Sequence, residues 1–167
     1  MSGPRNGGTA VVPGSYDPVT FGHLDIIGRA ANVFDNVIVG VVNQPVRKKQ
    51  TVFSAEERVA FIQAEVAEYP NVQVKPFDTL LVDFAREHGA KVIVKGLRAI
   101  SDFEYEFEMN QLNRKMAPEI ESMYMMAAPQ FSFLSSSGIK ELAMFGGDIE
   151  GLVPDPVAAR LQEELKR

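Results

Sequence analysis

A histidine follows a turn rich in glycine and proline near the start of the chain. The turn runs from Pro13 to Gly22 after a short apolar segment, and His23 stands at the start of an amphipathic stretch. Small residues let a backbone approach a ligand closely, and a helix N-terminus presents unpaired N–H groups and the positive end of a dipole. An imidazole at this position adds a hydrogen-bond donor directed at phosphate. The segment therefore predicts a site for nucleotide chemistry.

Neither of the commoner phosphate-binding loops occurs in the chain. There is no G-x-x-x-x-G-K-[ST] sequence, and the turn after the first apolar run lacks G-x-G-x-x-G. The segment Thr20-Phe21-Gly22-His23 instead resembles the T/H-x-G-H motif of the nucleotidyltransferase superfamily. Taken alone, His23 could also be a helix-capping or a buried histidine, so the interpretation depends on the rest of the chain.

Composition limits the classes of protein to which the chain can belong. Its 167 residues fit a flexible leader over residues 1–8 and a single domain over residues 9–167. The net charge of −5 argues against a nucleic-acid partner, which needs a basic face. The absence of cysteine excludes disulfides, thiolate metal sites and cysteine nucleophiles, and it agrees with a reducing cytoplasm. We find no signal peptide and no apolar run of membrane-spanning length, so we expect a cytoplasmic protein with no membrane partner.

The hydrophobic pattern alternates between strand and helix along the chain. Two segments, Ser54-Ala55-Glu56-Glu57 and Ser101-Asp102-Phe103-Glu104, match the capping box that opens a helix. Met123, Met125 and Met126 are interpreted as core residues. We expect strands over residues 9–12, 37–42, 72–77, 92–94 and 123–127, and helices over 22–34, 55 to about 69, 79–88, 101 to about 116, 136–145 and from Asp155 onward.

Strands separated by helices predict an α/β fold, a Rossmann-like open parallel five-stranded sheet with helices on both faces. In such sheets, ligands bind outside the carboxyl ends of the strands. Four polar segments follow strands and should converge on that edge: the turn before His23, a basic loop over residues 43–53, the Lys95-Gly96-Leu97-Arg98 turn, and the Ser135-Ser136-Ser137 cluster. Any one of these segments could be a solvated loop. That explanation does not account well for four such segments at the same edge.

Longer stretches resemble the bacterial phosphopantetheine adenylyltransferases. The matching sequences are PGSYDPVTFGHLDII, FSAEER, VKGLRAISDFEYE, QLNR and FSFLSSSGIKE, in the family's order and over nearly the whole chain from about residue 9. The resemblance implies transfer of the adenylyl group of ATP to 4′-phosphopantetheine, giving dephospho-CoA and pyrophosphate, with Mg²⁺ as cofactor. It also implies a homohexamer that is inhibited by CoA.

The resemblance also implies roles for individual residues. His23 would donate to the α-phosphate, Ser15 would bind the incoming phosphate, and Arg98 and Lys95 would contact the phosphates of both substrates. Asp17 is interpreted as a turn residue, and no side chains are assigned to a metal. Lys140 could join the phosphate site or be solvated, and Leu80 and Leu81 would suit a helix core equally well. The implied ATP-binding residues are Ser15, Tyr16, His23, Lys95, Gly96, Arg98, Glu106, Ser135, Ser136 and Ser137; the implied phosphopantetheine-binding residues are Ser15, Arg47, Lys49, Leu80, Leu81, Lys95 and Asn113.

The basic loop departs from the family pattern, because it is about two residues longer than usual. Counting from Pro45 places Arg47 in the slot of the family's catalytic lysine, and counting back from Phe53 places Lys49 there. A solvated basic loop is the alternative for Arg47, Lys48 and Lys49. We favour Lys49, because the capping box at Ser54 anchors the downstream side of the loop.

Two competing functions stay open at this point. One is a related nucleotidyltransferase that uses another phosphate acceptor, although the KGLR and DFEYE segments argue against it. The other is a non-catalytic ATP-binding sensor domain on the same scaffold. Simple binding would not need a donor at the α-phosphate, so the combination of Ser15, His23 and Arg98 favours an enzyme.

Overall fold

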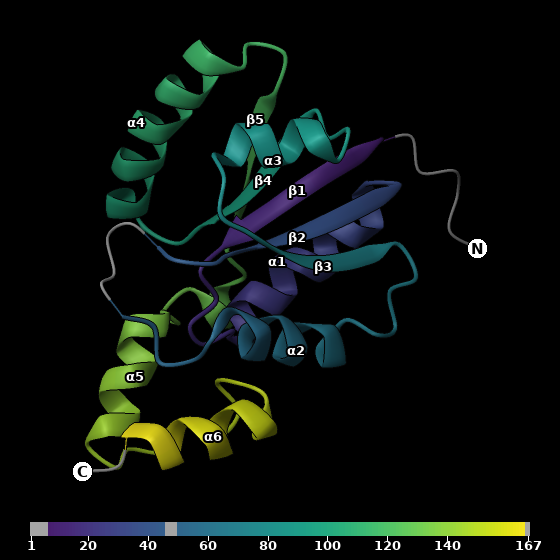
Figure 1. Ribbon diagram of the computed structural model, residues 1–167. Coiled ribbons are helices and arrows are strands. Elements are labelled where there is room, and N and C mark those ends of the chain that lie inside the picture. The colour runs from purple at the N-terminus through teal and green to yellow at the C-terminus, as the bar shows by residue number, and fades with distance from the viewer. Residues whose placement is uncertain (1–6, 46–49, 166–167) are drawn as a thin grey trace.

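A five-stranded, wholly parallel sheet forms the centre of the molecule in the order β3-β2-β1-β4-β5. This computed structural model describes residues 7–45 and 50–165. The sheet and the helices on both of its faces confirm the expected fold class (Figure 1). The elements are β1 (Thr9–Gly14), α1 (Phe21–Val33), β2 (Asn36–Val42), α2 (Ala55–Glu65), β3 (Val72–Phe77), α3 (Leu81–Glu87), β4 (Val92–Leu97), α4 (Ile100–Met116), β5 (Glu121–Met126), the 3-10 turn η1 (Pro129–Phe131), α5 (Ser136–Met144) and α6 (Asp155–Leu165).

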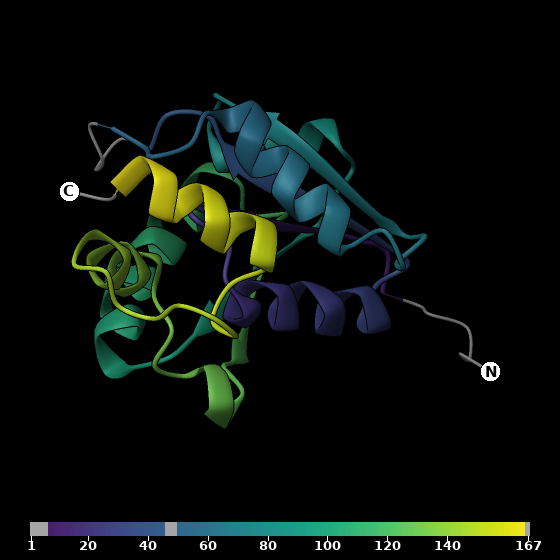
Figure 2. The same ribbon diagram turned by 90° about the horizontal axis from the view of Figure 1, so that it is seen from below.

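Two apolar cores lie on opposite faces of the sheet. The larger one joins the sheet to α1, α2, α5 and α6, and the smaller one joins it to α3. The β-branched run of β2 supplies both, with Val37 and Val39 on one face and Ile38 on the other. Seen from below, α6 lies along α2 (Figure 2), where Arg160 Nη2 is 2.9 Å from Glu57 Oε1. The C-terminal helix thereby covers the face on which α1 and α2 pack.

The sheet reverses its winding between β1 and β4. β1 pairs with β2 along its whole length, from Thr9 opposite Asn36 to Gly14 opposite Val41. Its pairing with β4 covers only Ala10 and Val11, opposite Val92 and Ile93. The carboxyl ends of β1 and β4 are therefore unpaired with each other, which leaves room at the point where open α/β sheets bind ligands.

Three local predictions were wrong, and each failed for a reason outside its own segment. Lys95 to Leu97 belong to β4 rather than to a turn, because β5 continues to pair with them as far as Met126. α4 begins at Ile100 with Ala99 as its N-cap, so Ser101 does not open it. Met126 is 67% exposed, because β5 is an edge strand, and Met123 is also exposed.

The leader predicted over residues 1–8 lies mostly outside the described residues. Gly8 is described, and its N–H donates to Asp35 Oδ2 at 3.1 Å. Its carbonyl accepts from the backbone N–H groups of Asp35 and Asn36. These bonds attach Gly8 to the turn between α1 and β2, at the edge of the sheet opposite the carboxyl ends.

Candidate active site

The described parts of the four polar segments lie together at the carboxyl ends of the strands, as expected. In Figure 1 this edge faces left, between α4 above and α5 below. Direct hydrogen bonds join the segments: Ser136 Oγ donates to the Pro18 carbonyl at 2.8 Å, and Arg98 Nη1 donates to the Leu134 carbonyl at 2.6 Å. The turn after β1, the turn after β4 and the start of α5 thus form one connected surface, which we call the rim.

His23 is the third residue of α1 and is held by a capping box. The Thr20 hydroxyl accepts from the His23 backbone N–H at 3.3 Å, and the Thr20 N–H donates to His23 Nδ1 at 3.0 Å. Because Nδ1 accepts that bond, the proton of the neutral ring is assigned to Nε2. The Tyr16 ring lies edge-on at 5.0 Å between centroids and fixes the ring plane further. Capping and ligand binding are therefore compatible roles for this histidine.

The turn between β1 and α1 is held in a conformation that few residues adopt. Tyr16 has a φ of 49°, which is uncommon for a bulky residue and marks backbone strain. The ring is buried, and its hydroxyl donates to the Val12 carbonyl at 2.9 Å. Burial raises the pKa of the Tyr16 phenol, so it stays a donor. A Cβ on Gly14 would lie 3.0 Å from the Tyr16 ring, which explains glycine there. The side chain of Tyr16, which was assigned to ATP binding, is therefore buried under the turn and supports its conformation.

Asp17 has the structural role that the sequence analysis expected. Its carboxylate is 0% exposed and accepts from the backbone N–H groups of Val52 and Phe53, at 3.0 and 3.1 Å. Lys140 Nζ lies 3.3 Å from its Oδ2. Lys140 is therefore paired within the rim, and the Asp17 carboxylate joins the first turn to the downstream end of the basic loop.

Arg98 lies at the rim with its guanidinium already oriented. Its Nε and Nη2 donate to the two carboxylate oxygens of Asp102, at 3.1 and 3.3 Å, and Nη1 reaches the Leu134 carbonyl. The Asp102 carboxylate also accepts from the Arg98 backbone N–H at 3.1 Å. A planar guanidinium can make all these bonds and still direct further N–H groups at a phosphate.

Lys95 and Glu106 form an ion pair of 2.7 Å, with both side chains mostly buried. The pair joins β4 to α4, two elements on which the sequence analysis placed ATP-binding residues. Gly96 follows on the strand, and a Cβ there would come within 3.1 Å of Ile26. Close packing of β4 on α1 therefore explains glycine at this position, in addition to its assigned role in ATP binding.

The three serines before and within α5 have different partners. Ser135 is the N-cap, and its hydroxyl accepts from the Gly138 N–H at 3.0 Å. Ser136 is bonded to the Pro18 carbonyl, and Ser137 is exposed. The bond from Ser136 places the N-terminus of α5 beside the turn that leads into α1. Two helix N-termini, neither with an acidic residue in its first turn, therefore lie at the same rim.

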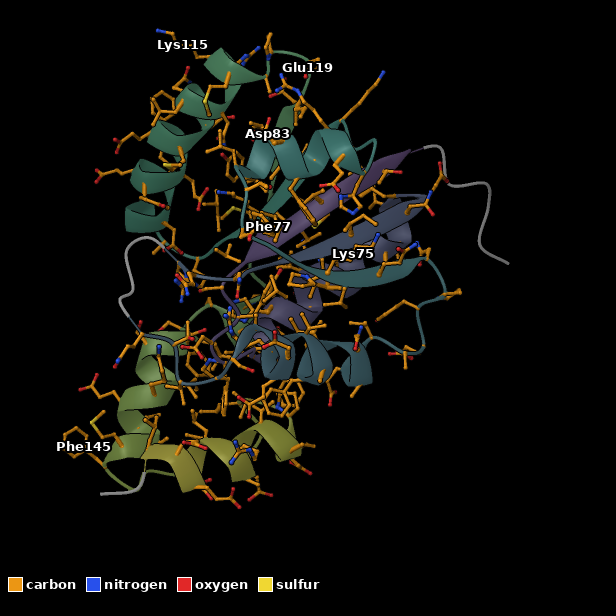
Figure 3. All side chains as sticks on the ribbon, in the orientation of Figure 1. Lys75, Phe77, Asp83, Lys115, Glu119 and Phe145 are labelled. Carbon is orange, nitrogen blue, oxygen red and sulfur yellow. The ribbon has the colours of Figure 1, made fainter. Side chains whose placement is uncertain are left out.

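The residues assigned to phosphopantetheine are more dispersed. Leu80 is the N-cap of α3 at the carboxyl end of β3 and is 55% exposed, so the alternative of a core residue is wrong for it. Leu81 packs against the smaller core. Asn113 lies about 20 Å along α4 from its first turn, near Lys115 at the upper end of the helix in Figure 3. Arg47, Lys48 and Lys49 lie outside the described residues.

Two residues of the rim were missed in the sequence analysis. Asp102 was interpreted as part of a capping box, but its carboxylate binds Arg98. Arg58 was not assigned any role, yet it is buried and bonded to backbone carbonyls at the ends of β1 and β2. A signal for Arg58 was present, because it shares the inward face of α2 with Ala55 and Ile62.

Within residues 7–45 and 50–165, no group of three or more His, Cys, Asp or Glu side chains is arranged to hold a metal ion. Over the same residues, no helix is both long and apolar enough to cross a bilayer.

Comparison with known proteins places these features in a family. Residues 11–142 match the family model described as cytidylyltransferase-like. The phosphopantetheine adenylyltransferase of Clostridium tetani is 57% identical over 89% of this chain and 91% of its own. The enzyme of that name from Rubrobacter xylanophilus is 52% identical over 95% of each chain. A crystal structure from Vibrio parahaemolyticus, of a protein named as a nicotinate-nucleotide adenylyltransferase, has a TM-score of 0.69 over 95% of this chain and 94% of its own, at 17% identity, and supports the fold alone.

Proposed function

This chain belongs to the phosphopantetheine adenylyltransferases of the cytidylyltransferase-like family, and we propose that the rim binds ATP and 4′-phosphopantetheine for adenylyl transfer. The products are dephospho-CoA and pyrophosphate, a step of coenzyme A biosynthesis. The observation that carries the assignment of the site is the bond that holds the N-terminus of α5 beside the turn leading into α1, whose first turn carries a histidine with Nδ1 already bonded.

The reaction needs positioning more than it needs a base. A phosphate oxygen of 4′-phosphopantetheine attacks the α-phosphorus of ATP in line, and the bond to the bridging oxygen of the β-phosphate breaks. The electron pair of that bond leaves with pyrophosphate. Since the attacking oxygen is already ionised near neutral pH, catalysis rests on orientation and on stabilising the charge that develops. The rim offers such groups: helix ends, hydroxyls, cations and one imidazole.

His23 Nε2–H is the donor that we assign to the α-phosphate. The hydrogen bond to Nδ1 and the edge-on contact with the Tyr16 ring orient the His23 ring. In this role His23 donates a hydrogen bond and does not transfer its proton. Ser15 directly follows β1 and is half-buried. We assign its hydroxyl to the incoming phosphate. Donors that are fixed before the charge develops are worth most in the transition state.

The leaving pyrophosphate is assigned to the start of α5. Unbonded N–H groups at a helix N-terminus bind phosphate oxygens, and Ser136 holds this terminus against Pro18. Arg98 bridges the turn after β4 and the Leu134 carbonyl just before this helix, so its remaining donors reach the same region. The Lys95–Glu106 pair, on the other side of that turn, suits the nucleotide end of ATP.

Mg²⁺ is expected to bind through the phosphates of ATP rather than in a protein cage. The described residues provide no cluster of metal ligands, and the Asp17 carboxylate is buried with its own donors. Such a site fits an ion that keeps several waters and few protein ligands. When bound, Mg²⁺ would neutralise charge on the leaving pyrophosphate.

A homohexamer, inhibition by CoA and a cytoplasmic location stay predictions. Apolar side chains on α4 and β5 that the monomer leaves exposed support association with further copies. CoA contains both the adenylyl and the pantetheine parts of the product, which supports its binding at the same rim. The exposed side chains are Phe103, Phe107, Leu112, Met116, Met123 and Met126.

The test of the function is release of pyrophosphate from ATP by the purified protein with and without 4′-phosphopantetheine. We expect release that depends on the acceptor, together with dephospho-CoA detected by mass spectrometry. Release with nicotinamide mononucleotide or glycerol phosphate instead would favour the alternative acceptor. ATP binding without release would favour the sensor domain.

His23→Ala should lower kcat by about 10²–10³-fold, the range for loss of one transition-state donor. The KM for ATP should change much less, because the bond strengthens as charge develops. The chain has two histidines, and His88→Ala is the matched control. His88 caps the far end of α3, with its Nδ1 2.8 Å from the Phe84 carbonyl, and its variant should turn over like the wild type. A loss of only a few-fold in folded His23→Ala would contradict the assigned role.

Arg98→Ala should raise the KM for ATP by about 10-fold or more, since a charged hydrogen bond to phosphate is lost. Arg98→Lys should recover only part of the affinity, because an ammonium cannot bond Asp102 and Leu134 and still reach a phosphate. Arg86→Lys is the control, since Arg86 makes a comparable fork with Glu119 and the Met116 carbonyl at the opposite edge. Unchanged kinetics in Arg98→Ala would remove this residue from the site.

The basic loop is tested by single alanine substitutions measured for kcat. The capping box at Ser54 is confirmed, and Phe53 is buried beside it, which supports counting back from Phe53. We therefore expect Lys49→Ala to lower kcat far more than Arg47→Ala or Lys48→Ala. A larger effect at Arg47 would place the catalytic slot there. Three mild effects would mean that the loop only attracts anions.

A further inference from the structure

Arg58 is a buried cation whose hydrogen bonds go to backbone carbonyls. It is 1% exposed on the inward face of α2. Its Nε donates to the carbonyls of Phe53 and Ser54, at 3.1 and 3.3 Å, within its own N-terminal turn. Burial lowers the pKa of the guanidinium, with the charges of Asp17 and Glu56 opposing that shift.

The two Nη atoms of Arg58 reach other segments of the chain. Nη1 donates to the carbonyls of Ser15 and Val42, both at 2.7 Å, and Nη2 donates to the Asn43 carbonyl at 2.8 Å. Val42 is the last residue of β2, and Asn43 is the first residue of the basic loop. One guanidinium therefore fixes the upstream end of the basic loop to the residue that we assign to the incoming phosphate.

Asp17 does the same at the downstream end of that loop. Its carboxylate accepts from Val52 and Phe53, the last two residues before the cap of α2. Asp17 lies two residues from Ser15 and six from His23 in the same turn and helix start. Both ends of the segment 43–53 are thus bonded to the 15–17 segment by a buried charge.

An apolar side chain of similar volume would fill the inward face of α2 without burying a charge. It would also leave the carbonyls of Ser15, Val42 and Asn43 without their donor, so Arg58 contributes to stability as well as to geometry. What arginine alone provides is a rigid planar fork that spans several acceptors at once, whereas a lysine offers one compact ammonium. The requirement for arginine rather than lysine is therefore geometric.

We propose that Arg58, together with Asp17, is a positioning residue of the adenylyl transfer reaction: the two side chains hold both ends of the basic loop, at Asn43 and at Val52–Phe53, against the Ser15–His23 phosphate site. The proposal rests on the function proposed above. Neither residue touches substrate in this scheme, and both act through the backbone of Ser15 and of the loop. Misplacing reacting groups by about 1 Å can cost about 10²-fold in rate, so the effect should appear in kcat.

The test compares Arg58→Met and Arg58→Lys with the wild type in the full-length chain. We expect kcat to fall about 10- to 100-fold in both variants, with the KM for ATP within about threefold, as for an interaction expressed in the transition state. Amide hydrogen exchange, read by mass spectrometry, should rise over residues 43–45, 50–53 and 14–17 and stay unchanged in β2 and β3. Arg58→Lys keeps the charge, so its failure to restore kcat separates geometry from electrostatics.

Arg86→Met is the matched control. Arg86 also makes several hydrogen bonds, to Asp83, Glu119 and the Met116 carbonyl, at the edge of the sheet opposite the rim. Its loss should lower the unfolding midpoint while kcat and exchange over residues 43–45 and 50–53 stay close to wild type. If the control loses as much kcat as the Arg58 variants at the same loss of unfolding midpoint, then the loss of kcat reflects stability alone. That result would overturn the proposal.

Asp17→Asn keeps the test decisive if an Arg58 variant does not fold. It preserves volume at the other anchor and should show the same selective loss of kcat and the same faster exchange over residues 43–45 and 50–53. Wild-type kcat in folded Arg58→Lys, Arg58→Met or Asp17→Asn would overturn the proposal. If the wild type itself releases no pyrophosphate, the proposed function fails, while hydrogen exchange still reports whether these residues hold the loop.

Discussion

Two buried charges, the Asp17 carboxylate and the Arg58 guanidinium, satisfy the backbone where β1 and β2 end and their loops begin. A chain that leaves a sheet loses its ladder partners, and buried N–H and C=O groups must find others. Arg58 donates to carbonyls of Ser15, Val42 and Asn43, and Asp17 accepts from two loop N–H groups. The rest of the rim depends on these hydrogen bonds, because they hold the two ends of the basic loop next to the turn before α1.

A chain with a net charge of −5 concentrates positive groups at one edge and pairs three of them with acids. Among the described residues of the rim, Lys95 lies 2.7 Å from Glu106, Lys140 lies 3.3 Å from Asp17, and Arg98 binds Asp102. These pairs offset repulsion between neighbouring cations and orient them, while the helix N-termini add positive potential without added side chains. Phosphate groups then meet donors that need little rearrangement.

Local patterns predicted the elements well where local interactions decide them. The Ser54 capping box and the β-branched strand β2 depend on neighbours in sequence, and both were predicted within a residue. The end of β4 was not, because β4 continues as long as the distant strand β5 pairs with it. The start of α4 was not either, because the Asp102 carboxylate pairs with Arg98, four residues earlier, instead of capping the helix. The exposure of Met126 could not be predicted for the same reason. The local pattern of an apolar strand predicts a core residue, and it does not tell whether the strand lies at the edge of the sheet.

The placement of His23, Arg98 and Ser136 at one edge could be predicted, because each follows a strand and parallel strands end at the same edge. Their roles toward phosphate stay predictions that rest on the chemistry of their side chains. Arg58 escaped prediction because its partners are backbone carbonyls, which every residue possesses and which leave no trace in sequence. Its one signal was a charge in the apolar stripe of α2 between Ala55 and Ile62. A buried charge on a helix face next to a loop end is therefore a sign that the helix organises that loop, and it is best sought by asking which carbonyls the loop leaves unpaired.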